Sequence, residues 1–254
     1  MMLIYKKLTV LLIAIFLPAI VFAFTTEQIQ TATSKGNVAF VLVTEPGAAG
    51  TDLARQKIQD AIAKVPGSVM IESNRTDAAN LSFVQEYKLS SAPVPLIFVF
   101  ASNGVMAGGN LASKLSVSQI VAMVPSPKRA EMLKAIKSGL AVYVTAYRTG
   151  MSTKTDVSKD CAIACTKMQG KCIAIDVDMD DLDERDLLNQ LKINFASAEP
   201  TTVVINAKGQ ITDSYTGMVE VEKLIASATK VVASGCCPPN SGKTCGPAPK
   251  KKGN

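Results

Sequence analysis

The most informative absence from this chain of 254 residues is histidine, of which it has none. Without an imidazole there can be no Ser-His-Asp or Cys-His catalytic arrangement, because both use histidine as the proton acceptor. Mixed cysteine and histidine zinc sites are excluded for the same reason. The function must therefore be one that does not depend on histidine.

A basic face is also missing from the body of the chain. The formal net charge is +6. Six lysines near the two ends account for this value: Lys6, Lys7, Lys243, Lys250, Lys251 and Lys252. The body between them is close to neutral, and no nucleic-acid partner is predicted, because such a partner requires a basic patch or stripe.

The first 23 residues have the pattern of a secretory signal peptide. Two lysines precede an apolar run at residues 8–22, and Val21 and Ala23 stand where a signal peptidase reads the chain. Cleavage there predicts a periplasmic or secreted protein whose mature N-terminus is Phe24. The run is shorter than the about 20 apolar residues that cross a bilayer, so no stable membrane span is predicted after cleavage. An uncleaved anchor is the alternative.

The rest of the chain contains one pattern twice. Each half begins with a helical segment that ends at a glycine, Gly36 or Gly139, and an apolar strand follows. An amphipathic helix, a second strand, another helical segment and a strand introduced by proline come next in both halves. The proline and the glycine nine residues after it bound residues 95–104 and 200–209. Equivalent positions lie 103 to 105 residues apart, so the repeating unit is a whole domain.

This pattern predicts an α/β protein with two tandem domains. The β-α-β order requires a parallel strand pair with a crossover helix, and the strand after each second glycine closes an antiparallel hairpin, so each central sheet is mixed. We assign residues 1–23 to the signal peptide, 24–124 to the first domain and 126–233 to the second. Residues 234–254 form a tail of cysteine, proline, glycine and lysine without hydrophobic periodicity.

Both halves resemble the thioredoxin superfamily. The resemblance rests on a helix-Gly-strand unit, a strand that ends in an acidic turn (IESNRTD; IDVDMDD), and a hairpin led by proline. It implies a thioredoxin-like fold in each half and a cis proline before the third strand, which nominates Pro95 and Pro200 with the preceding Val94 and Glu199. Pro93 is a rival to Pro95. In that superfamily the loop at the cis proline offers main-chain groups to an extended polypeptide.

Neither half has the Cys-x-x-Cys motif that thioredoxins use in catalysis. The motif belongs where the first central strand meets the next helix, because a helix N-terminus stabilises the thiolate. In the first half Ala-Ala-Gly-Thr at residues 48–51 occupies that position, and Thr51 or Asp52 is expected to cap the helix. The candidate caps in the second half are Ser152, Thr153, Thr155 and Asp156.

Three of the six cysteines lie inside the second domain. Cys161 and Cys165 are four residues apart on one face of a predicted helix, and Cys172 begins the next strand. Cys161 falls in mid-helix, away from the helix dipole, so we expect a buried thiol of low reactivity. Core or disulfide cysteines are the favoured interpretation, with a non-standard redox pair or a thiolate metal site as alternatives.

The other three cysteines, Cys236, Cys237 and Cys245, lie in the tail. They can pair structurally, exchange disulfides or bind a soft metal such as Cu(I). If all six cysteines pair within one chain, at least one bridge must join the tail to the domain. The expected arrangement joins Cys172 to Cys161 or Cys165, the other of these two to Cys236 or Cys237, and the remaining adjacent cysteine to Cys245.

The sequence therefore predicts an exported, non-catalytic thioredoxin-like protein that binds extended polypeptide or a periplasmic partner protein and needs no cofactor. A thiol-disulfide oxidoreductase that uses the cysteines of the second domain and the tail is the first alternative. A soft-metal carrier that uses the tail cysteines is the second.

Overall fold

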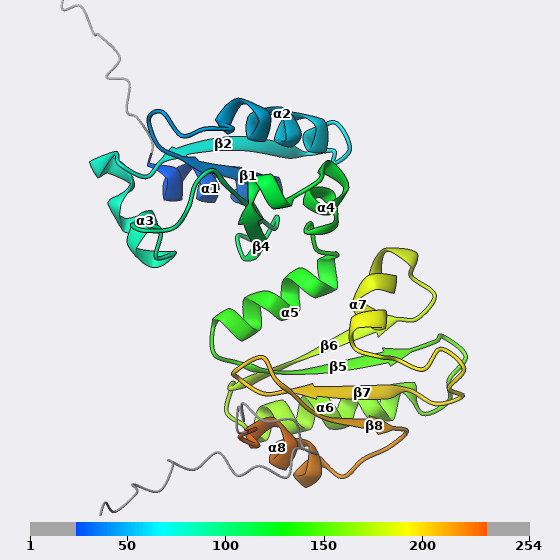
Figure 1. The fold of residues 1–254 in the computed structure, drawn as a ribbon. Helices are drawn as coiled ribbons and strands as arrows, with labels where there is room; N and C mark the ends of the chain where they lie inside the picture. Colours follow the sequence, from blue (N-terminus) through cyan, green and yellow to red (C-terminus); the bar gives the residue numbers. More distant parts are fainter. Residues whose placement is uncertain (1–23, 233–254) are drawn as a thin grey trace, which may run out of the picture.

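The computed structural model describes residues 24–232, which form two α/β domains in tandem (Figure 1). The first contains α1 (Thr25–Ser34), β1 (Val38–Thr44), α2 (Thr51–Ile62), β2 (Ser68–Asn74), η1 (Ala78–Asn80), α3 (Leu81–Glu86), β3 (Leu96–Phe100), β4 (Met106–Leu111), η2 (Ala112–Lys114) and α4 (Val117–Ala122). The second contains α5 (Pro127–Lys137), β5 (Ala141–Tyr147), α6 (Lys154–Lys167), β6 (Cys172–Asp178), η3 (Leu182–Glu184), α7 (Arg185–Gln190), β7 (Thr201–Ile205), β8 (Ile211–Thr216) and α8 (Val221–Thr229). The signal peptide and the tail of the sequence-based assignment lie outside the described residues. No helix within residues 24–232 has the length and hydropathy that crossing a bilayer demands.

Each domain is built on one four-stranded mixed sheet. The strand orders are β2-β1-β3-β4 and β6-β5-β7-β8. In both sheets the first two neighbours are parallel and the remaining pairs are antiparallel. The parallel pairs need crossover connections, which α2 and α6 supply. The predicted mixed sheets and the internal repeat are thus confirmed.

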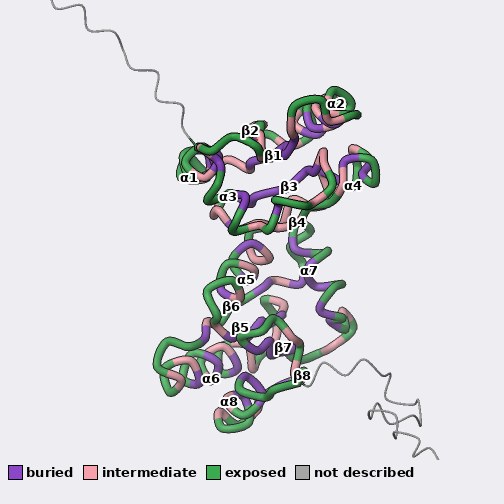
Figure 2. The backbone as a smooth tube through the Cα atoms, turned by 60° about the vertical axis from the view of Figure 1, so that its left-hand side comes forward, coloured by how far each residue is buried: buried purple, intermediate pink, exposed green. Residues whose placement is uncertain are grey.

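Alternation along the central strands divides the core of each domain into two layers. In β1, Phe40 packs with residues of α2 and α4, whereas Val41 packs with residues of α1 and α3 on the opposite face. In β5, Tyr143 faces α6 and α8, and Val142 faces α5 and α7. Because successive side chains of a strand point to opposite faces, β1 and β5 are buried along nearly their whole length (Figure 2).

The helix α5 belongs to the second domain and also contacts the first. Its start is well defined, because the Ser126 side chain accepts a hydrogen bond from the Arg129 N–H and Pro127 occupies the first helical position. A small apolar cluster joins α5 to the turn between β3 and β4: Ala101, Val105, Ala130 and Leu133. The Asn103 amide also donates to the Ala130 carbonyl at 2.7 Å. In Figure 1 this helix lies between the two sheets.

Candidate functional site

The loop that leads from α3 into β3 contains a cis peptide bond, Val94–Pro95, as the resemblance implied. The Pro95 carbonyl accepts a hydrogen bond from the Ala112 N–H at 2.9 Å, which ties the loop to the end of β4. The Val94 side chain packs against the core of the first domain. Within residues 24–232, no hydrogen bond engages the N–H or the C=O of Val94. These two main-chain groups are therefore available to a bound extended chain.

The equivalent loop of the second domain differs, and the expectation of a second cis proline is wrong. Pro200 follows a trans peptide bond, although its carbonyl accepts from the Gly217 N–H at 2.8 Å and so holds the same place in the sheet. Trans is the lower-energy isomer by about 0.5 to 1 kcal/mol. The Ser197 hydroxyl donates to the Glu199 carbonyl at 2.7 Å and accepts from its N–H at 3.3 Å. The main chain of Glu199 is thus already engaged within the domain.

A small apolar hollow separates the Pro95 loop from the start of α2. Its volume is about 70 Å³, and it is lined by Ala49, Gly50, Leu53, Ala54, Lys57, Pro95, Ala112 and Ser113. Leu53 stands at its rim with 62% of its surface exposed. Lys57 Nζ donates to the carbonyls of Ala112 and Leu115 at 2.9 and 2.8 Å, which fixes the wall formed by η2. The hollow can accept a small apolar side chain next to the free groups of Val94.

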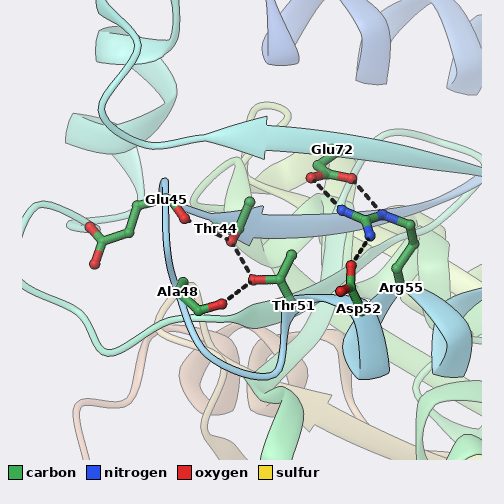
Figure 3. A network of polar contacts seen from close by, with 7 residues as sticks. All are labelled: Thr44, Glu45, Ala48, Thr51, Asp52, Arg55 and Glu72. Carbon is green, nitrogen blue, oxygen red and sulfur yellow. Dashed lines mark hydrogen bonds and ion pairs between the residues drawn. The ribbon is translucent and has the colours of Figure 1, made fainter.

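The start of α2 is where a thioredoxin would carry its first cysteine, and residues 48–51 lie there as predicted. The expected cap is wrong, because the N-cap is Gly50, whose φ of 81° is left-handed and which has no side chain to accept a hydrogen bond. The Thr51 hydroxyl instead donates to the Ala48 carbonyl at 2.8 Å and lies 2.9 Å from the Thr44 hydroxyl (Figure 3). In the second domain Thr153 is the N-cap of α6, also without a side-chain hydrogen bond.

Charged groups near the start of α2 are paired within the chain. Arg55 donates to both carboxylate oxygens of Glu72 at 3.1 and 3.0 Å and forms an ion pair with Asp52 (Figure 3). Hydrogen bonds donated by the Arg55 guanidinium to the carboxylates of Glu72 and Asp52 raise its pKa above the ordinary value. The charges of Arg55, Asp52 and Glu72 are therefore paired with one another, whereas the Lys57 ammonium, which lines the hollow, donates to main-chain carbonyls.

An arginine that no motif indicated orders the loop before Pro95. Arg75 pairs with Glu45 at 2.6 Å and donates to the carbonyls of Leu89 and Ala92. It thereby ties the chain that leads to Pro95 to the loop between β1 and α2. In the second domain Arg148 makes a similar link, because it donates to the Phe195 carbonyl at 2.8 Å and pairs with Asp180 at 3.0 Å. Nothing in the residue pattern marked these arginines.

A buried carboxylate fixes the start of α5. Glu184 is 2% exposed and accepts hydrogen bonds from the Ser126 hydroxyl and the Lys128 N–H at the start of α5. In the first domain Asn80 has the equivalent role, because its side-chain oxygen accepts from the N–H and the hydroxyl of Thr25 at the start of α1. The repeat places these two residues in register, and this was the signal that could have identified them.

The cysteines of the second domain are separated into a disulfide and a free thiol. Cys165 and Cys172 are bridged and join the end of α6 to the start of β6, which confirms one of the two predicted pairings. Cys161 is free, fully buried, and 3.6 Å from the Thr145 hydroxyl. Burial raises the pKa of the Cys161 thiol, the opposite of what an attacking thiolate needs.

The free state of Cys161 corrects the expected bridge from this residue to the tail. Its sulfur faces β5 and β7 inside the core, between Thr145 and Thr202, so a partner could reach it only if α6 moved away. The tail cysteines, Cys236, Cys237 and Cys245, lie outside the described residues. Across residues 24–232, no three potential ligands among cysteine, aspartate and glutamate are grouped so as to hold a metal ion.

No protein-family model and no curated protein sequence matches the chain. Among solved structures it is similar to the zinc-bound form of human ERp44, with 11% identity, a TM-score of 0.34, and coverage of 80% of this chain and 57% of that one. It is similar to the first two thioredoxin domains of Naumovozyma dairenensis Eps1p, with 10% identity, a TM-score of 0.30, and coverage of 80% and 95%. Thioredoxin O2 from Arabidopsis thaliana matches 38% of this chain over 84% of its own length, with 17% identity and a TM-score of 0.29.

Likenesses this distant carry no argument about activity. The fold is nevertheless clear from the strand orders, which the two domains share, and in the first domain also from the cis proline before β3. The chain consists of two tandem thioredoxin-like domains, and among the described residues neither domain has a cysteine at the start of the helix after its first strand.

Proposed function

We propose that this protein binds extended polypeptide at the Val94–Pro95 loop of its first domain and performs no thiol chemistry there. The observation that carries the proposal is the pair of main-chain groups on Val94 that have no partner within residues 24–232. An extended chain can bond to both groups as a strand does, and the adjacent hollow with Leu53 at its rim gives a preference for apolar side chains.

The two domains have different parts in this proposal. The first domain binds the polypeptide, because the N–H and C=O of Val94 have no partner within residues 24–232 and Arg75 holds the loop in place. The second domain is assigned no polypeptide-binding role, because the N–H and C=O of Glu199 are already hydrogen-bonded to the Ser197 hydroxyl. The absence of a cysteine from residues 48–51 and the burial of Cys161 both favour binding over catalysis.

Export is part of the same proposal. The signal-peptide pattern of residues 1–23 supports it, and so does the Cys165–Cys172 disulfide, because disulfides persist in the periplasm and outside the cell. We expect N-terminal sequencing of the exported protein to return Phe24. An intact Met1 in a membrane fraction would contradict this part of the proposal.

The binding proposal can be tested with a fluorescein-labelled polypeptide that is kept unfolded by reduction and carboxymethylation. Leu53→Asp removes the apolar rim, and we expect the dissociation constant measured by fluorescence anisotropy to rise about tenfold, because burying a leucine side chain contributes about 1.5 to 3 kcal/mol. Leu182→Asp is the matched control, since Leu182 is 75% exposed and lies in the second domain. An equal loss in both variants, or no binding by the unaltered protein, would refute the proposal.

An activity measurement distinguishes the oxidoreductase alternative from the binding proposal. We expect the protein to reduce insulin no faster than a simple thiol at equal concentration. Turnover above that level, abolished by Cys165→Ala or by Cys236→Ser, would place the alternative first.

A further inference from the structure

A larger cavity lies in the second domain, at the end of the sheet opposite to the Pro200 loop. Its volume is about 270 Å³, and the segments around it are the start of β5, the turn between β7 and β8, and the end of α8. The lining residues are Gly139, Ala141, Met168, Lys171, Asn206, Ala207, Lys208, Ala228, Thr229, Lys230 and Val231. It shares no lining residue with the Pro95 loop or with the hollow beside it.

The walls of this cavity are held in place on two sides. Met168 and Lys171 lie in the short segment that the Cys165–Cys172 disulfide closes, and Met168 Sδ accepts a hydrogen bond from the Tyr143 hydroxyl at 3.3 Å. On the other side the Asn206 amide donates to the Lys230 carbonyl at 3.0 Å, which ties the β7–β8 turn to the end of α8. The cavity is therefore formed before any ligand arrives.

The chemistry of the cavity is that of an apolar interior with a cationic rim. Ala141, Met168 and Ala228 line the interior, and Val231 is 70% exposed at the edge. Three lysines lie around it: Lys171, Lys208 and Lys230. Lys230 lies 4.0 Å from the Asp213 carboxylate, whereas neither Lys171 nor Lys208 has an ion pair within residues 24–232. No acidic residue lines the cavity.

We propose that this cavity binds a single-chain amphiphile with an anionic headgroup, such as a fatty carboxylate. The hydrocarbon chain occupies the apolar interior, and the headgroup lies between the Lys171 and Lys208 ammonium groups. The volume of about 270 Å³ lies just below the about 300 to 1,000 Å³ typical of ligand sites, which favours one acyl chain over a two-chain lipid. The chain's own tail has the wrong charge for this rim, since it carries Lys243, Lys250, Lys251 and Lys252.

The proposal can be tested by isothermal titration calorimetry on the full mature protein. The probes are sodium decanoate and decyltrimethylammonium bromide, both below the concentrations at which they form micelles. They share the chain length and differ in the sign of the headgroup. We expect saturable binding of decanoate, weakened by added salt, and no saturable binding of the cationic amphiphile.

The double variant Lys171→Glu/Lys208→Glu reverses both unpaired charges, and we expect it to raise the dissociation constant for decanoate about tenfold. Lys35→Glu/Lys114→Glu is the matched control, because it changes the net charge equally on exposed lysines of the first domain, and its affinity should stay within about twofold. Ala228→Leu, which fills the interior without a change of charge, should also weaken binding, with folding checked by circular dichroism.

Three results would overturn the proposal. The first is an unchanged affinity in the charge-reversed variant, and the second is equal binding of the two probes by the unaltered protein. The third is decanoate binding that appears only after residues 233–254 are deleted, which would assign the cavity to the chain's own terminal segment.

Discussion

The Cys165–Cys172 disulfide gives the sharpest quantitative prediction. The two cysteines are seven positions apart, and the bridge connects the end of α6 to the start of β6. For a closed loop of about eight residues, the chain-entropy relation gives a loss of about 8 cal/mol/K in the unfolded chain, or about 2.5 kcal/mol at 25 °C. We therefore expect Cys165→Ala/Cys172→Ala to lower the free energy of unfolding of the second domain by about that amount.

Alanine is the appropriate replacement because Cys172 is only 5% exposed, so a serine there would add the cost of a buried hydroxyl. Urea unfolding followed by circular dichroism measures the change. With a slope of about 1 to 3 kcal/mol/M, a loss of about 2.5 kcal/mol lowers the midpoint by about 1 to 2.5 M. The transition of the first domain should stay in place, because the bridge lies entirely in the second.

The control is the protein that keeps both Cys165 and Cys172, measured with and without reductant. All proteins in this comparison carry Cys236→Ser, Cys237→Ser and Cys245→Ser, so that no tail thiol can form a new bridge. Reduced protein and the double alanine variant should unfold at similar midpoints. Coincident curves for oxidised and reduced protein, or alkylation of Cys165 without prior reduction, would refute the reasoning.

Three further predictions concern other groups. Replacement of the buried Glu184 by alanine should lower the free energy of unfolding, measured by thermal unfolding, by about 3 kcal/mol, because two donors at the start of α5 lose their acceptor. Replacement by glutamine should lower it less. Burial raises the pKa of Cys161 and of Tyr143, so the folded chain keeps protons that the unfolded chain releases. The contribution of these two groups to stability should therefore be constant below about pH 8.5 and decrease above it, and Tyr143→Phe should reduce that decrease; a decrease of equal size in the variant would contradict the assignment. Arg75→Ala should weaken polypeptide binding, measured by anisotropy, whereas Arg55→Ala, which removes the ion pairs with Asp52 and Glu72, should not.

The architecture of this protein could be predicted from the sequence because the pattern is local and occurs twice. Gly36 and Gly139 end helices in a left-handed conformation, with φ of 78° and 74°, as their positions predicted. The cysteine spacing likewise allowed Cys172 to pair with Cys165, and the absence of cysteine from residues 48–51 could be read directly. These features depend on neighbours along the chain, which a sequence displays.

The tertiary structure alone decided which of the two proline loops leaves the main chain before its proline without a hydrogen-bond partner. Pro95 and Pro200 stand at equivalent positions, yet only the former follows a cis bond within residues 24–232, and only the latter has a serine that engages the preceding main chain. The burial of Cys161 beneath α6 and the lysine-rimmed cavity of the second domain also arise from residues far apart in sequence. Their properties depend on distances between elements that meet only when the sheets form, and no local pattern encodes those distances.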